Sequence, residues 1–208
     1  MSTRFIGVYG KTCAGKRTLG EYLSSVMDCR YISFGDHKRD EIAKRTETGA
    51  QIEEHLRLKE QIPPHLGYRV VGGAIQRGLN IISGYPISLD EFELISSRCP
   101  MVGLVLLHVN ESEQKRRFTL RRECPKCHKL GMEGDVCPVD KAKMVCRQDA
   151  NVEELAKRRV LYEHRIAEFL LLSPITEIPR LVLDTSGLTR EEVGKRTESW
   201  IEQLHTRD

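Results

Sequence analysis

Residues 10–18 read GKTCAGKRT, which matches the phosphate-binding loop pattern G-x-x-x-x-G-K-x-T. The apolar run Phe5–Tyr9 precedes this loop, and the helix-like stretch Leu19–Leu23 follows it. A strand, a glycine-rich loop and a helix in this order point backbone N–H groups and the positive end of the helix at one anion. We therefore interpret the stretch as a phosphate site and not as a glycine-rich turn without function.

The residues of this loop have separate expected roles. Lys16 is expected to reach the β- and γ-phosphates of a nucleotide, and Thr18 to hold Mg²⁺. The residues expected to bind the nucleotide phosphates are Gly10, Ala14, Gly15, Lys16, Arg17 and Thr18.

Apolar, strand-like segments alternate with helical segments along the chain. The expected strands are residues 5–9, 30–33, 79–83, 102–109 and 180–184. The expected helices are residues 18–27, 64–77, 89–97, 152–172 and 189–204. This alternation predicts an α/β fold of the P-loop NTPase type, in which helices flank a parallel five-stranded sheet. Its ligand should lie at the carboxyl ends of the strands, where the phosphate loop also lies.

Two of these helices carry further signals. Thr189 and Glu192 have the spacing of a capping box at the start of the last helix. The expected inner stripe of the long helix is Leu155, Val160, Ile166, Ala167 and Leu170.

Two segments interrupt the alternation. Residues 35–63 are charged and helical, and residues 113–149 are basic, cysteine-rich and poor in apolar side chains. We interpret both as subdomains inserted over the site, which leaves residues 1–34, 64–112 and 150–208 as the core.

The composition excludes several classes of protein. The chain has 208 residues, of which 39% are hydrophobic, enough for one core domain. A net charge of +3 among 30% charged residues is too balanced to indicate nucleic-acid binding. No apolar run is long enough to span a membrane, and the first residues lack the features of a targeting segment. Seven unevenly spaced cysteines fit a reducing compartment, so we expect a cytoplasmic protein. We also expect it to be a monomer.

The cysteines of the second inserted segment have the spacing of a metal site. Cys124-Pro-Lys-Cys127 is followed, after nine residues, by Cys137-Pro-Val-Asp140. Each unit is a tight knuckle that points two ligands at one centre, and zinc prefers four such ligands in a tetrahedron. We expect a structural Zn²⁺ held by Cys124, Cys127, Cys137 and Asp140.

Other interpretations of this cluster stay open. Cys146 and His128 are alternatives to Asp140 as the fourth ligand. Free thiols or a disulfide are the alternative to a metal site.

Arginines flank the cysteine segment. Arg117 and Arg121 are four residues apart and would share one helix face, while Arg147 and Arg158 follow the segment. Phosphoryl transfer needs such groups, because the transferred group carries charge on three oxygens and an arginine can pair with two of them. Asp149 could orient Arg147 or Arg158. A solvated basic face is the alternative.

Taken together, these motifs resemble the adenylate kinases, within the nucleoside monophosphate kinase family. The resemblance covers about residues 4–172. It rests on the loop GKTCAGKRT, on ISFGDHKR (32–39), on SGYP (83–86), and on RFTLRRECPKC (117–127), CPVD (137–140), CRQDAN (146–151) and KRRVLY (157–162).

The resemblance implies a role for each inserted segment. Residues 35–63 would be the monophosphate-binding insertion, and residues 113–149 a zinc-bearing lid, for which the family includes Cys-Cys-Cys-Asp sites. The family's lid arginines and lid aspartate correspond to Arg117, Arg121, Arg147, Arg158 and Asp149. With Lys16, these are the expected catalytic residues.

The departures from the family pattern lie on the acceptor side. Phe34 stands where the family has a small hydroxyl near the adenine, and Ser83 stands where it has a carboxylate associated with the metal waters. Ile87 replaces an arginine that grips the monophosphate, and Glu91 replaces the glutamine that reads adenine. The expected substrate-binding residues are Phe34, Arg39, Gly84 and Glu91.

The expected function is therefore the transfer of the ATP γ-phosphoryl group to a nucleoside monophosphate. AMP is the default acceptor, and the altered residues leave the base open. The expected cofactors are ATP, Mg²⁺ and structural Zn²⁺, and the partners are nucleotides. The alternatives are a nucleotide-binding regulator or sensor with little kinase activity, and an ATPase or a kinase for another small acceptor.

Overall fold

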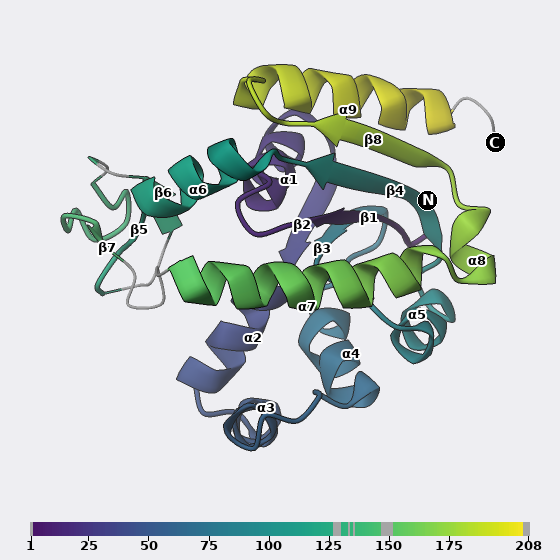
Figure 1. Cartoon of the computed structure of the whole chain (residues 1–208). Helices are drawn as coiled ribbons and strands as arrows, with labels where there is room; N and C mark the ends of the chain where they lie inside the picture. Colours follow the sequence, from purple (N-terminus) through teal and green to yellow (C-terminus); the bar gives the residue numbers. More distant parts are fainter. Residues whose placement is uncertain (1, 127–129, 133, 135, 147–151, 206–208) are drawn as a thin grey trace.

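A parallel five-stranded sheet forms the centre of the molecule (Figure 1). Its strands lie in the order β2-β3-β1-β4-β8, and every neighbouring pair is parallel. The strands are β1 (Arg4–Gly10), β2 (Cys29–Ser33), β3 (Leu79–Ser83), β4 (Met101–His108) and β8 (Arg180–Asp184). The expected fold class is confirmed, and each expected strand lies within about one residue of the observed bounds.

The computed structural model describes residues 2–126, 130–132, 134, 136–146 and 152–205. The helices that pack on the sheet or extend from it are α1 (Lys16–Val26), α4 (Pro64–Gly72), α5 (Leu89–Ser96), α6 (Glu111–Leu120), α7 (Val152–Leu170), α8 (Ser173–Thr176) and α9 (Arg190–His205). None of the described helices is both long enough and apolar enough to cross a membrane.

Alternate residues of the strands pack into two separate apolar cores, one on each face of the sheet. On β1, Ile6 and Val8 pack with α1 and α9, while Phe5 and Tyr9 pack with α4, α5 and α7 on the opposite face. All four side chains are at most 1% exposed. This period of two is the geometry of a strand covered on both faces, so the apolar content of β1 is what makes it the central strand.

Residues 34–57 form a helical hairpin beside the sheet, which consists of α2 (Phe34–Ala43) and α3 (Glu47–Arg57). Ile52 on α3 is fully buried against Leu66 and Val70 of α4. The segment expected to be charged and helical is therefore helical and is held by a small apolar core.

A second, three-stranded antiparallel sheet lies at the end of α6, away from the main sheet (Figure 1). Its strands are β5 (Arg121–Glu123), β6 (Leu130–Met132) and β7 (Val145–Cys146), in the order β6-β5-β7. The sequence analysis did not anticipate this sheet, because strands of two or three residues are too short to show an alternating pattern.

The helix expected at residues 64–77 is shorter than predicted. It ends at Gly72, and the side chain of Asn80 holds the segment that follows. Asn80 accepts the N–H of Gln76 at 3.0 Å and donates to the oxygen of Gln76 at 2.8 Å. These bonds replace the helical hydrogen bonds that Gln76 would otherwise make.

The inner stripe expected for α7 is partly wrong. Val160 is 62% exposed and Ala167 is also exposed, whereas Ile166 and Phe169 are buried. Among the described side chains of α7, those that pack in the core lie in its last turns, and the helix starts near the small sheet (Figure 1). The side chain of Leu155 lies outside the described part of the structure.

The capping box of α9 is confirmed. The Thr189 hydroxyl oxygen accepts the N–H of Glu192 at 3.2 Å, and a Glu192 carboxylate oxygen accepts the N–H of Thr189 at 2.7 Å.

Two glycines provide a matched test of the packing of α2 against α3. A Cβ on Gly49 would lie 2.1 Å from the backbone oxygen of Glu41, which cannot move aside without moving α2. A Cβ on Gly73 would meet nothing within 4 Å. We expect Gly49→Ala to lower the free energy of unfolding by about 1–3 kcal/mol. Gly73→Ala should leave it unchanged or raise it slightly. Equal effects of the two variants in denaturant unfolding would contradict the close contact between the helices.

Candidate active site

The loop between β1 and α1 lies at the carboxyl end of the central strand. Gly10 has φ +154°, and a Cβ there would lie 2.6 Å from the Leu107 oxygen of β4. Gly15, with φ +98°, precedes the first residue of α1. At Gly10, only glycine adopts this backbone conformation and fits against β4 without strain. Gly15 also has a positive φ, so the conformation of the loop explains both glycines. Ala14 between them is fully buried.

Lys16 begins α1 and folds back over the loop. Its ammonium donates to the backbone oxygens of Gly10 at 2.5 Å and Lys11 at 2.9 Å. Burial lowers the pKa of Lys16 to about 8, and the positive charge of Arg121 acts in the same direction. A phosphate group would give this desolvated cation a better partner than two neutral carbonyls. Thr18, one residue further than Arg17 along α1, is exposed.

Three side chains from distant segments hold the backbone of this loop. The Gln114 amide of α6 donates to the Thr12 oxygen at 2.9 Å, and Arg117 donates to the Cys13 oxygen at 3.3 Å. The Thr185 hydroxyl lies 3.1 Å from the Ala14 oxygen. The shape of the loop therefore depends on α6 and on the end of β8 as well as on its own sequence.

Arg117 also links α6 to the residue that follows β8. Its guanidinium donates to the Thr185 backbone oxygen at 2.6 Å and to the Thr185 hydroxyl at 3.1 Å. Its Nε donates to Glu113 at 2.7 Å. Hydrogen bonds from Arg116 and Arg117 lower the pKa of Glu113 to about 2, so this carboxylate stays ionised beside the arginine.

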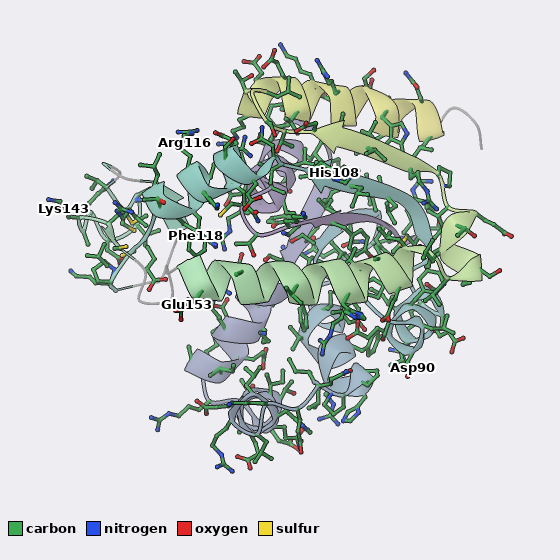
Figure 2. All side chains as sticks on the ribbon, viewed as in Figure 1. Asp90, His108, Arg116, Phe118, Lys143 and Glu153 are labelled. Carbon is green, nitrogen blue, oxygen red and sulfur yellow. The ribbon has the colours of Figure 1, made fainter. Side chains whose placement is uncertain are left out.

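The four-residue spacing predicted that Arg117 and Arg121 share one helix face. This prediction is wrong. Helix α6 ends at Leu120, and Arg121 has ψ 133° and begins β5. The two arginines nevertheless approach the same loop residue. Burial raises the pKa of the Cys13 thiol, and the charges of Arg121, Lys16 and Arg117 oppose that rise. Figure 2 shows the region of α6, with Arg116 and Phe118 on that helix and Glu153 at the start of α7.

A second group of charges lies between α1 and α2. The carboxylate of Asp36 pairs with Arg17 of α1 through one oxygen and with Arg39 of α2 through the other. Burial works against ionisation of Asp36, but its bonds to Arg17 and the charge of Arg39 hold its pKa below the usual value. Ser33 caps α2 by accepting the Asp36 N–H at 3.3 Å. Two guanidinium groups are thus held next to the helix that begins with Lys16.

Ser83 ends β3 beside this group. Its hydroxyl lies 3.0 Å from the Tyr31 hydroxyl of β2, and the residue is 5% exposed. Gly84 follows with φ +76°, a conformation that glycine adopts without strain.

Phe34, Tyr85 and Glu91 come together between α2, α4 and α5. The rings of Phe34 and Tyr85 are 5.5 Å apart, and Glu91 is 7% exposed. A Glu91 carboxylate oxygen accepts the Ile87 N–H at 2.7 Å. Burial raises the pKa of Glu91, while the Ile87 N–H and the charge of Arg165 oppose that rise.

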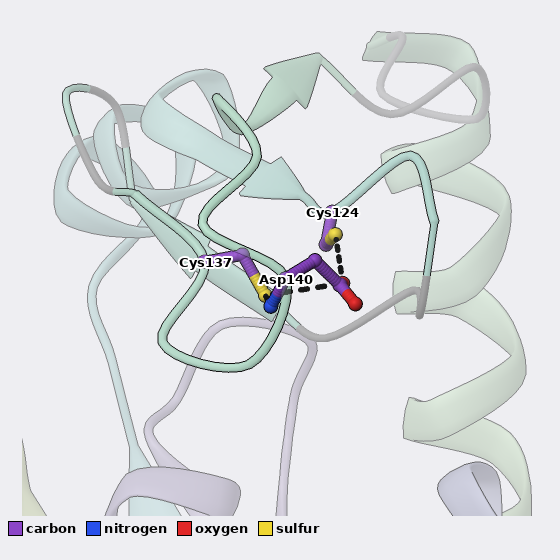
Figure 3. Close-up of side chains that lie close together, drawn as sticks. All are labelled: Cys124, Cys137 and Asp140. Carbon is purple, nitrogen blue, oxygen red and sulfur yellow. Dashed lines mark hydrogen bonds between the residues drawn. The ribbon is translucent and has the colours of Figure 1, made fainter.

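Cys124, Cys137 and Asp140 converge below the small sheet (Figure 3). An Asp140 oxygen lies 2.9 Å from the Cys124 sulfur and 3.4 Å from the Cys137 sulfur. Both cysteines are fully buried. The N–H group of Lys126 points at the Cys124 sulfur and that of Asp140 at the Cys137 sulfur, each at 3.4 Å. Two thiols and a carboxylate in this arrangement are a donor set that suits zinc.

Some expected site residues fall outside this description. Cys127, His128, Arg147 and Asp149 are not among the described residues, and neither is the side chain of Arg158. Cys146 is exposed on β7 and does not belong to the metal cluster of the described residues. No two of the cysteines described here form a disulfide.

Sequence reasoning missed Asp36, Gln114 and Thr185 as site residues. Asp36 was visible within the quoted motif ISFGDHKR, and Thr185 directly follows an expected strand of a parallel sheet, where functional polar residues gather. No sequence signal distinguishes Gln114 from other polar residues of α6.

Comparisons with known proteins agree with this geometry. No family model matches the chain. The adenylate kinase of Mycoplasmopsis pulmonis is 26% identical, with 97% of this chain and 99% of the relative covered. The adenylate kinase of Thermotoga maritima is 30% identical over 76% of this chain and 78% of its own length. The adenylate kinase of Thermococcus onnurineus is 27% identical over 97% and 95% of the two chains.

Proposed function

The chain belongs to the adenylate kinase family, and we propose that it transfers the γ-phosphoryl group of ATP to a nucleoside monophosphate. The observation that carries this proposal is the loop at residues 10–18, whose backbone is held by α6 and by Thr185 around a desolvated Lys16. An anion site of this kind suits the phosphates of a nucleotide.

The donor side would be formed by the loop and its arginines. Gly10, Ala14, Gly15, Lys16, Arg17 and Thr18 are the residues proposed to surround the ATP phosphates. Lys16 and Thr18 would bind phosphate oxygen and Mg²⁺ respectively, and Mg²⁺ when bound neutralises the phosphates. The described residues fit this assignment, because Thr18 is exposed at the start of α1 and the Lys16 ammonium lies over the loop.

The acceptor side would be formed by α2, the end of β3 and α5. Arg39 is proposed to hold the acceptor phosphate, with Asp36 fixing its guanidinium. Phe34, Gly84 and Glu91 are proposed to contact the rest of the acceptor. Residues 35–63 are then the monophosphate-binding insertion of the family.

Residues 113–149 are proposed to act as a lid. Arg121 is already near Cys13 and Lys16, which supports a role close to the transferred group. Arg147, Arg158 and Asp149 are proposed to complete the arginine set. Catalysis would then consist of positioning and of neutralising charge while the lid excludes water.

The lid is proposed to hold a structural Zn²⁺. Cys124, Cys137 and Asp140 would be three of its ligands, and Cys127 the fourth. The metal would fix a segment in which the described apolar cluster consists of Cys124, Cys137, Met144 and Ala142.

The transfer reaction is tested by measuring nucleoside diphosphate formation from ATP with a panel of nucleoside monophosphates. We expect turnover that depends on a monophosphate. Lys16→Ala should abolish this turnover, while Lys195→Ala, the same substitution on exposed α9, should leave it unchanged. ATP consumption that no monophosphate stimulates would contradict the proposed function.

The low pKa of Lys16 predicts how ATP affinity varies with pH. Below about pH 8 the ammonium is charged and binds phosphate, and above it the charge is lost, so the affinity should fall with rising pH. Calorimetry should show a decrease approaching tenfold per pH unit above this value. Lys16→Arg stays charged and should bind with an affinity that is constant from about pH 7 to 9.5. A constant affinity in the wild-type protein would contradict the role of Lys16.

Metal content tests the lid. We expect about one zinc per chain by elemental analysis, and Cys124→Ser and Cys137→Ser should each lose it and lower the thermal stability of the lid. Cys146→Ser removes an exposed thiol outside the cluster and should retain zinc. The wild-type chain without zinc, or the same loss in Cys146→Ser, would contradict the assigned ligands.

A further inference from the structure

Glu91 presents one carboxylate oxygen that has a partner and one that has none. Oxygen Oε2 accepts the Ile87 N–H at 2.7 Å, which fixes the side chain on the first turn of α5. Oxygen Oε1 has no hydrogen-bond donor among the described residues, since the bond from Ile87 is the one recorded for this carboxylate.

This second oxygen is still reachable from solvent. In the described part of the chain, Ser96 Oγ is the one side-chain nitrogen or oxygen atom that is both sealed from solvent and without a partner. Glu91 Oε1 has no partner, so it must retain some accessible surface, in agreement with the 7% exposure of the residue. A buried carboxylate with one open oxygen is costly unless a ligand supplies a donor.

The surroundings of Oε1 suit a flat ring. The position that a Cβ would take on Gly67 is 3.1 Å from Oε1 and 3.0 Å from the Tyr85 ring, so α4 packs closely on both groups and a side chain there would crowd Oε1. Tyr85 in turn packs against Phe34, whose ring is only partly buried. Tyr85 itself is fully buried, so Phe34 is the ring of this pair that could contact a nucleobase.

We propose that Glu91 makes this protein select an acceptor monophosphate that carries guanine, or hypoxanthine as the weaker case, in preference to adenine. This inference rests on the proposed function, since it names the acceptor of the same reaction. An ionised carboxylate can only accept hydrogen bonds. Guanine offers a ring N–H and an amino group side by side on one edge. Hypoxanthine offers the ring N–H alone.

Adenine presents the opposite pattern to Glu91. Its amino group lies beside a ring nitrogen that carries a lone pair, and this lone pair would face the carboxylate. Burial raises the pKa of Glu91, while the Ile87 N–H and the positive charge of Arg165 favour the ionised form, which accepts hydrogen bonds. The adenine amino group could donate to the open oxygen, but the ring lone pair would then face the same carboxylate. Guanine places a second donor there, and this difference is the basis of the selection.

The test compares GMP, IMP and AMP as acceptors at pH 8, where a carboxyl group is ionised. We expect kcat/KM for GMP to exceed that for AMP by about tenfold or more, with IMP between them. Glu91→Gln keeps the shape but adds an amide donor that matches adenine, and it should reverse the preference. Asp90→Asn removes the same charge from the exposed neighbouring position on α5 and should leave the ratio unchanged (Figure 2).

Equilibrium binding separates this inference from the proposed reaction. If no monophosphate supports turnover, the proposed function fails. The affinities of the wild-type protein for GMP and AMP, measured by calorimetry, still test whether Glu91 selects guanine. The same binding ratio decides it if Glu91→Gln does not fold. Equal or better use or binding of AMP by the wild-type protein overturns the proposal. So does an unchanged GMP-to-AMP ratio in a folded Glu91→Gln variant.

Discussion

The hydrogen bonds that hold the backbone of residues 12–14 are the constraint on which the rest of the site depends. Gln114, Arg117 and Thr185 reach these three residues from segments more than a hundred positions later in the chain. They hold the loop in one conformation, so less conformational entropy is lost when the loop binds a ligand. Because Thr185 follows β8 and Arg117 lies on α6, these bonds tie the loop to the last strand of the sheet and to α6.

The same constraint places two groups of positive charge at one edge of the sheet. Lys16 and Arg121 lie by the loop, and the Asp36 carboxylate holds Arg17 and Arg39 between α1 and α2. A phosphoryl group that passes between two nucleotides needs cations on both sides of its path. Ile87 carries no charge, so the cation proposed for the acceptor side is Arg39, which is oriented by a carboxylate that also binds Arg17 of α1.

The fold followed from the sequence because its signals were local and strong. Five apolar strands, a loop with a fixed glycine pattern and a capping box at Thr189 each reflect contacts within a few residues, and the structure has all of them. Failures came where a distant side chain decided the outcome. Asn80 holds the segment that follows the helix starting at Pro64, and Val160 on α7 is exposed.

The site was only partly visible for the same reason. The sequence predicts Lys16 from the phosphate-loop pattern, and it predicts Cys124, Cys137 and Asp140 from the spacing of a metal site. Gln114 and Thr185 act through backbone atoms of the loop, and such contacts depend on tertiary geometry and not on spacing. Glu91 was visible as a changed residue, but only the bond from Ile87 shows that one of its oxygens is taken and the other is open.

The central claim is that the loop presents ATP as a phosphoryl donor to a second nucleotide and not to water. Incubation with ATP that carries labelled phosphorus in the γ-position, together with GMP and AMP, tests this claim most directly. The account predicts that the label appears in a nucleoside diphosphate, with little in inorganic phosphate, because the proposed lid would exclude water. Label that accumulates only in inorganic phosphate would contradict it.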